Sequence, residues 1–143
     1  MKIKDLDAKI LFELKAGESP ETIAQKLKLP KSTMYYHFGK LKKLGFIRGV
    51  KVTIDYEQLK DTKEAFILVS LSKTDVKSLQ EFEDYIKNTK LLSDAYAVGG
   101  DWDYLLVVHG KEEDVTRFLM NYVQTLPNVV KTHSLFVLKH IEL

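Results

Sequence analysis

Apolar residues in the first fifty positions recur every three or four residues, which is the spacing of an amphipathic helix. The spacing predicts a first helix that begins near Lys4, a second that Ser19 caps and Pro20 opens, and a third that ends at Gly45. Each helix is too short to bury its apolar side alone. We therefore expect one small shared core, formed by Leu6, Ile10, Leu11, Leu14, Ile23, Ala24, Leu27, Met34, Phe38 and Leu41.

The apolar spacing changes to alternation in "FIRGVKVTIDY", which follows the third helix. Val50, Val52 and Ile54 would share one side of an extended chain, so this segment is predicted to be a strand. The polar residues from Gln58 to Glu64 make a hinge between two modules.

The second module reads strand, helix, strand, strand, helix, strand. Its strands are "AFILVSL", "DAYAVGG", "YLLVVHG" and the long "VVKTHSLFVLKHIEL". This order is that of a ferredoxin-like βαββαβ module, in which both helices cover one face of a four-stranded antiparallel sheet. The fold class is therefore α+β, with a helical domain over residues 1–50, a strand and hinge over 51–63, and the ferredoxin-like domain over 64–143. The uncovered sheet face predicts a partner, most simply a second copy of the chain.

Charge is distributed unevenly over the 143 residues. Residues 1–60 hold 13 Lys and Arg against 7 Asp and Glu, a net of +6, and residues 61–143 hold 9 against 13, a net of −4; together these give the overall +2. A basic first half favours a polyanionic partner. The chain has no Cys, which is typical of a reducing cytoplasm, and no apolar run approaching the ~20 residues of a membrane span.

The third predicted helix, "KSTMYYHFGKLKK", carries the polar side chains that suggest a function. A second helix after a tight turn, inside a basic module, is the helix-turn-helix arrangement, whose second helix can lie in the major groove of DNA. Hydroxyl groups near the start of this helix can donate hydrogen bonds to phosphates, and its aromatic and imidazole groups can reach base edges. The lysine and arginine side chains toward its end and beyond can pair with phosphates. The predicted DNA contacts are Ser32, Thr33, Tyr36, His37, Lys40, Lys43 and Arg48. The alternative is a solvated polar helix face with half-buried tyrosines.

The segment "VGGDWDY" places two glycines and two carboxylates in one hairpin connection. Asp101 and Asp103 could receive the ammonium group of an amino acid, and the backbone of Gly99 and Gly100 its carboxylate. Spacing alone favours an ordinary turn, in which Gly and Asp are the expected residues.

An enzyme is not expected. The four histidines lack the spacing of metal ligands, and the chain has no Cys nucleophile, no G-x-S-x-G motif and no phosphate-binding glycine loop. We expect no catalytic residue, no metal and no cofactor.

Three segments, "LDAKILFEL", "ETIAQKLKLPKSTMYYHFGKLKKLGFIRGVKVTID" and "VGGDWDYLLVV", together resemble the leucine-responsive and asparagine-operon (Lrp/AsnC) regulators, the feast/famine transcription factors of bacteria and archaea. The resemblance covers essentially the whole chain. It implies a winged-helix-like helix-turn-helix domain and a domain that assembles into dimers and larger oligomers, such as tetramers or octamers. It also implies an amino-acid effector site between dimers, lined by the positions that match Gly100, Asp101, Asp103, Thr132 and Ser134, although some relatives bind no known effector.

Two positions depart from the family pattern. Pro30 stands where relatives often have a helix-capping Ser, so the helix start must be closed in another way, for which Ser32 is the candidate. His37 stands where relatives often have Arg, which removes a fixed charge and a bidentate donor. No target sequence can therefore be inherited from the family.

Three functions follow, in order of preference. The first is a sequence-specific regulator of transcription that binds double-stranded DNA and responds to an amino acid. The second is an architectural DNA-coating protein, which the ratio of specific to non-specific affinity at fixed salt would distinguish. The third is a small-molecule-binding oligomer whose helical domain makes protein contacts only; charge reversal at Lys40 and Arg48 would leave such a protein unaffected.

Overall fold

The structure is a computed structural model that describes residues 4–141 and residue 143. The chain divides between Thr53 and Ile54 into two compact units, a helical unit and a sheet unit. None of the helices among the described residues has the length and apolar character needed to cross a bilayer.

The helical unit contains three helices, α1 (Asp5–Lys15), α2 (Pro20–Lys26) and α3 (Lys31–Lys43). The hydroxyl of Ser19 caps α2 as predicted, because it accepts a hydrogen bond from the backbone N–H of Thr22 at 3.2 Å. The three helices bury one common core, as the apolar spacing predicts. Its buried apolar residues are Ile10, Ile23, Ala24, Met34 and Leu41.

The predicted strand after α3 is absent. The chain between α3 and the short 3-10 helix η1 (Tyr56–Gln58) forms no strand, and Val50 and Val52 are exposed. An extended segment needs a neighbouring strand for its backbone hydrogen bonds. None of the four strands that the structure describes pairs with this segment, which explains why its alternating sequence does not form a strand here.

The sheet unit contains one four-stranded sheet in the order β2-β3-β1-β4. Its strands are β1 (Lys63–Leu71), β2 (Leu92–Ala97), β3 (Tyr104–Gly110) and β4 (Val129–Phe136), and every neighbouring pair is antiparallel. The observed connections and strand order are those of the predicted ferredoxin-like module, which confirms the α+β fold class.

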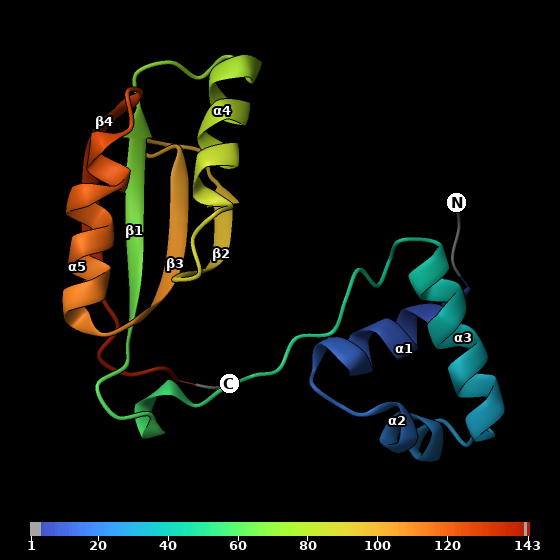
Figure 1. The fold of residues 1–143 in the computed structure, drawn as a ribbon. Coiled ribbons are helices and arrows are strands. Elements are labelled where there is room, and N and C mark those ends of the chain that lie inside the picture. The colour runs from blue at the N-terminus through green and yellow to red at the C-terminus, as the bar shows by residue number, and fades with distance from the viewer. Residues whose placement is uncertain (1–3, 142) are drawn as a thin grey trace. The chain divides into compact units, whose positions relative to one another are not determined.

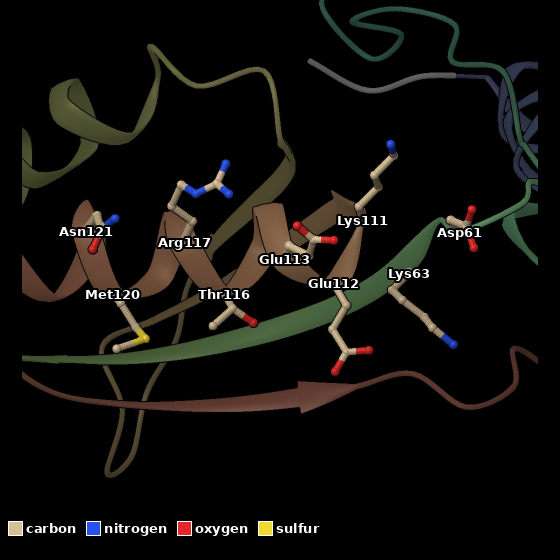
Figure 2. A pocket seen from close by; sticks show the side chains of 9 residues that line it. All are labelled: Asp61, Lys63, Lys111, Glu112, Glu113, Thr116, Arg117, Met120 and Asn121. Carbon is tan, nitrogen blue, oxygen red and sulfur yellow. The ribbon is translucent and has the colours of Figure 1, made fainter.

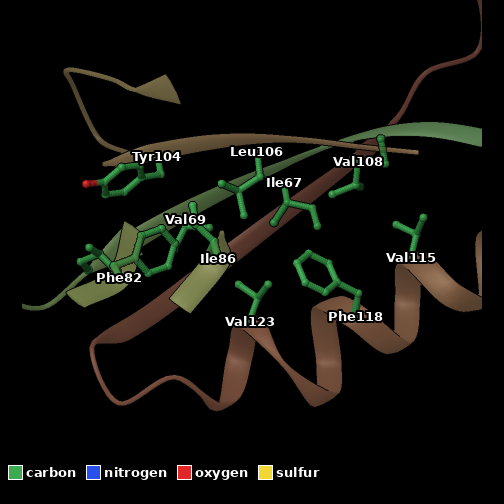
Figure 3. Close-up of a cluster of buried hydrophobic side chains, with 12 residues drawn as sticks. Ile67, Val69, Phe82, Ile86, Tyr104, Leu106, Val108, Val115, Phe118 and Val123 are labelled. Atoms are coloured by element: carbon green, nitrogen blue, oxygen red, sulfur yellow. The ribbon is translucent and has the colours of Figure 1, made fainter. Parts of the chain in front are cut away.

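Both helices of the sheet unit, α4 (Val76–Ile86) and α5 (Glu112–Asn121), lie on one face of the sheet (Figure 1). Asp75 caps α4, since its carboxylate accepts a hydrogen bond from the N–H of Ser78 at 3.3 Å. Alternate residues of β1 and β3 meet side chains of these helices in a common apolar core (Figure 3). Its fully buried members include Ile67, Val69, Leu106, Val108, Val115 and Val123.

The last strand is shorter than the sequence predicts. β4 ends at Phe136, which pairs with Ala65 near the start of β1. Beyond it, the N–H of Val137 donates to the carbonyl of Glu64 at 2.8 Å. The strand therefore stops where its partner stops, although the apolar sequence continues.

None of the helices that the structure describes in this unit lies on the opposite face of the sheet (Figure 1). Its side chains alternate with the core residues, so Phe66, Leu68, Leu105 and Val107 point to this face and are only partly buried. We call these four residues, with Leu135 on β4, the open apolar face.

Candidate functional site

Four exposed residues of α3 form a stripe along one side of the helix. Ser32, Tyr36, Gly39 and Lys43 stand at i, i+4, i+7 and i+11, so their Cα positions line up along the helix axis. The opposite side of α3 packs into the core of the helical unit. We call these four residues the α3 stripe.

One flank of α3 is bound to α1 through a buried carboxylate. Asp7 Oδ1 lies 2.8 Å from His37 Nδ1, and Lys40 Nζ donates to Asp7 Oδ2 over 3.1 Å. The Asp7 side chain is fully buried, whereas those of His37 and Lys40 are 13% and 31% exposed. Burial alone would raise the pKa of Asp7, but the hydrogen bonds and charges of its two partners outweigh burial and hold that pKa below its ordinary value.

This arrangement separates two residues from the other predicted DNA contacts. The sequence predicts that His37 and Lys40 contact DNA, but in the structure their side chains reach to Asp7 on α1. Asp7 is not among the residues predicted from sequence, although a signal exists: it stands three residues before Ile10 and four before Leu11, within the apolar side of α1. A carboxylate at such a position requires a buried hydrogen-bonding or cationic partner.

The other flank of α3 is tied to α2. The hydroxyl of Tyr35 donates a hydrogen bond to the carboxylate of Glu21, which raises the pKa of Tyr35 and lowers that of Glu21. Tyr36 belongs to the α3 stripe and is 68% exposed, with the edge of its ring against His37 at a centroid distance of 5.4 Å. The stripe therefore points away from both helices that hold α3.

The start of α3 carries no side-chain cap. Pro30 occupies the N-cap position, and no side chain among the described residues accepts a hydrogen bond from the first turn. Ser32, the candidate for closing this end, does not do so. Its exposed hydroxyl and the first-turn N–H groups are therefore available to an external acceptor. Thr33, one residue on, is partly buried.

The two carboxylates of the "GGDWD" turn have different surroundings. Asp103 Oδ2 accepts a hydrogen bond from the backbone N–H of Leu71 at 2.7 Å, and its own N–H donates to the carbonyl of Val69 at 2.9 Å. Asp101 is exposed, and Gly100 before it has φ +106°, the left-handed region that glycine favours. Asp103 thus fixes the turn to β1, while Asp101 faces solvent with the exposed Gly99 and Gly100.

Two predicted hydroxyl residues lie on the helix-covered side of the edge strand β4. Thr132 stands opposite Val69 and Ser134 opposite Ile67, and both of these β1 residues are fully buried. Gln124 Nε2 donates to Thr132 Oγ1 over 2.9 Å. The Oγ of Ser134 is buried and has no hydrogen-bond partner among the described residues. A hydroxyl in this condition can still bond to a ligand.

A separate open groove of about 900 Å³ runs along α5 near the start of β1 (Figure 2). Its side chains are spread along the helix rather than gathered at a point, and none of the predicted effector residues lines it. Arg117 in this groove already pairs with Asp114 on the same helix. Among the residues that the structure describes, no group of three His, Cys, Asp or Glu is arranged to hold a metal ion.

Both units match known families. Residues 64–142 match the Lrp/AsnC ligand binding domain, and residues 8–50 match a helix-turn-helix domain. An uncharacterised HTH-type transcriptional regulator of Pyrococcus furiosus is 33% identical over 137 residues, covering 94% of this chain and 90% of that protein. The Bkd operon transcriptional regulator of Pseudomonas aeruginosa is 30% identical over 122 residues, covering 85% and 80%.

The fold also has counterparts among solved structures. A transcriptional regulator of Neisseria meningitidis, crystallised as a complex with L-Met, superposes with a TM-score of 0.79 at 22% identity over 99% of this chain and 93% of that one. Together with the family matches, this confirms the resemblance that the sequence suggests. The protein is a transcriptional regulator, not an enzyme, and it belongs to the Lrp/AsnC family.

Proposed function

We propose that the protein regulates transcription by placing α3 in the major groove of double-stranded DNA and reading sequence with the α3 stripe. One observation carries this proposal: the stripe is the side of α3 that neither α1 nor α2 occupies, and it bears a hydroxyl, a phenol and a cation. These groups match the hydrogen-bonding edges of base pairs and the charge of phosphates.

The groups along α3 have separate roles in this proposal. Ser32 and Thr33, with the uncapped N–H groups of the first turn, bind a phosphate oxygen at the positive end of the helix dipole. Tyr36 reaches base edges from the middle of the stripe. Lys43 and Arg48, both exposed, neutralise phosphates farther along the groove.

His37 and Lys40 take a different role from the one that their sequence positions suggest. Both are bonded to Asp7, so a contact with DNA would have to break a hydrogen bond to a buried carboxylate. Leaving that carboxylate unpaired is costly. His37 and Lys40 therefore hold α3 at a fixed angle to α1. They affect DNA affinity indirectly, because this angle determines where the α3 stripe lies.

Binding to selected and random duplexes tests this assignment. Duplexes selected by the protein from a random pool, and unselected duplexes of the same length, would be titrated at several salt concentrations. Tyr36→Ala should cost about 1–3 kcal/mol on the selected duplex and little on random DNA, and Lys43→Ala should reduce the salt slope by about one on both. Tyr35→Phe is the matched control, since Tyr35 bonds to Glu21 and lies outside the stripe.

The outcomes separate the candidate functions. If the wild type binds selected and random duplexes equally, the architectural alternative replaces sequence-specific regulation. If the wild type discriminates but Tyr36→Ala does so equally well, the assignment of α3 as the reading element is wrong.

We also propose that a free amino acid binds at the "GGDWD" turn. Both of its charges need partners, because burying either one unpaired is costly. Asp101 is the exposed carboxylate that can receive the ammonium, the backbone of Gly99 and Gly100 can receive the carboxylate, and Ser134 offers an unused hydroxyl. Asp103 and Thr132 shape the site through their bonds to Leu71 and Gln124. The N. meningitidis relative, which shares the fold, was crystallised with L-Met.

Calorimetry with each of the twenty amino acids tests this site. We expect one or a few to bind, and Asp101→Ala to abolish the heat while leaving DNA affinity without effector unchanged. The bound amino acid should change DNA affinity, and DNA should change the affinity for the amino acid by the same factor. If no amino acid binds, the turn is a plain hairpin connection.

The open apolar face supports self-assembly as part of this function. The same face of a second copy would cover its five residues, Phe66, Leu68, Leu105, Val107 and Leu135, and the two copies would form a two-fold dimer. Such a dimer would offer two α3 helices to a near-palindromic DNA site in the cytoplasm. Larger assemblies, tetramers or octamers, would form from such dimers. Light scattering at micromolar concentration should find at least a dimer, and Leu68→Asp should give monomers if this face is the interface.

A further inference from the structure

Gly39 is a glycine in the interior of a helix, where glycine is unfavourable. It is the ninth of the 13 residues of α3, outside the first and last turns. A glycine at such a position costs roughly 1 kcal/mol of helix stability relative to alanine. The cost is not required by the backbone, because the glycines with positive φ among the described residues are Gly17, Gly45 and Gly100.

Packing within the chain does not require this glycine either. Among the described residues, a Cβ added at Gly39 would meet no atom within 4 Å apart from its two chain neighbours and the nearby backbone of α3 itself. Gly110 shows the contrast: a Cβ there would lie 2.9 Å from Leu91 Cδ2, so the Leu91 side chain would have to shift to make room for it. Neither the backbone conformation nor the packing of the helical unit therefore requires glycine at this position.

The position of Gly39 indicates another reason for a glycine. It stands in the α3 stripe, three residues after Tyr36 and four before Lys43. The long side chains on either side leave a gap between them in which the helix backbone itself is exposed. A surface that contacts both Tyr36 and Lys43 must also meet this gap.

We propose that Gly39 is a specificity-determining residue: its missing side chain lets the backbone of α3 come close to the base edges of the DNA major groove. This inference rests on the proposed function. DNA, rather than a second protein, is the occupant because the exposed Lys42 and Lys43 follow the gap, and lysine is depleted at protein interfaces but neutralises the phosphates of DNA. Depth of insertion matters to base contacts, which operate over hydrogen-bonding distances, more than to long-range attraction by phosphates.

The inference predicts opposite effects of one substitution on stability and on binding. Gly39→Ala should slow hydrogen exchange of α3 amides, because alanine favours the helix and meets no neighbour. It should nevertheless weaken binding to the selected duplex about threefold or more, and Gly39→Leu about tenfold or more, with a much smaller loss on random DNA. A substitution that stabilises the binding element and weakens binding identifies a steric requirement of the partner.

The test uses the full chain, with the selected and random duplexes already described. Thr116→Leu is the matched control, since it adds the same side chain at an exposed, neutral position of α5 and should leave DNA binding unchanged. If the wild type discriminates between duplexes and Gly39→Leu does so equally well, the role of Gly39 is wrong and the proposed function stands. If the wild type shows no discrimination, both the proposed function and this inference are wrong.

Discussion

The helical unit and the sheet unit differ in the interactions that hold their helices and strands in place. Twelve buried residues form the core of the sheet unit, and all of them are hydrophobic. The core of the helical unit has five such residues and, beside them, Asp7, which is the one charged residue that is fully buried among those described. A small core fixes helix orientation loosely, since apolar contacts are not directional. The hydrogen bonds that the Asp7 carboxylate accepts from His37 and Lys40 supply the direction.

The difference matters because the two units present different surfaces. The sheet unit offers an open apolar face, for which strand register is enough to place each side chain. The helical unit offers the α3 stripe, whose side chains must meet groups of a partner at hydrogen-bonding distance. We conclude that polar substitutions should affect the helical unit most strongly, and three predictions test this.

The largest effect is expected from removing both partners of Asp7. His37→Ala with Lys40→Ala leaves a buried carboxylate uncompensated, which should cost about 3–5 kcal/mol at neutral pH. Hydrogen exchange of α3 amides would measure the loss, and sheet amides serve as the internal reference. Adding Asp7→Asn should recover much of the protection, since the buried charge is then gone. Retained α3 protection in the double variant would show that apolar packing alone orients this helix.

A smaller effect is expected from Asp103 in the sheet unit. Asp103→Ala leaves the N–H of Leu71 without its acceptor, which should cost about 1–3 kcal/mol. Urea unfolding followed by the fluorescence of Trp102 would measure it. Asp101→Ala, two residues earlier and exposed, should change the free energy of unfolding by less than about 0.5 kcal/mol. Equal effects of the two substitutions would remove the distinction between a structural and a ligand-binding carboxylate.

The smallest effect is expected in the pH dependence of the free energy of unfolding, to which the ionisation of Asp7 contributes. Its pKa is lower in the folded chain than the ordinary value of 3.8, so folding favours the ionised form. Its stabilising contribution is therefore complete above the unfolded pKa of about 4 and is lost as pH falls through the folded pKa. The difference in stability between wild type and Asp7→Asn, from urea unfolding followed by circular dichroism, should be full at pH 7 and shrink below about pH 4. A difference that grows on acidification would contradict this.

Local features of the fold could be predicted from sequence, because neighbouring residues determine them. The cap at Ser19 and the apolar side of α3 depend on residues within one or two turns. Two strand predictions failed for the opposite reason. The strand predicted in "FIRGVKVTIDY" is absent and β4 is shorter than expected, because a strand forms only where a partner strand runs beside it.

Part of the candidate site could also be predicted from sequence, again where it depends on neighbouring residues. Ser32, Tyr36 and Lys43 are among the DNA contacts predicted from sequence, and in the structure these three are exposed on one side of α3. Helical spacing leaves His37 and Lys40 on a flank, where only the position of α1, some thirty residues away in sequence, decides between solvent and Asp7. Single-helix periodicity cannot contain that information.

Photo-crosslinking at two adjacent tyrosines tests the central claim most directly. Tyr35 and Tyr36 are both exposed, but Tyr35 bonds to Glu21 and only Tyr36 lies in the α3 stripe. A benzophenone-bearing phenylalanine analogue would replace each in turn, and each protein would be irradiated with its selected duplex. We expect strong crosslinking to DNA from position 36 and little from position 35. Equal crosslinking from both positions, or crosslinking from position 35 alone, would contradict the proposal that the α3 stripe enters the groove.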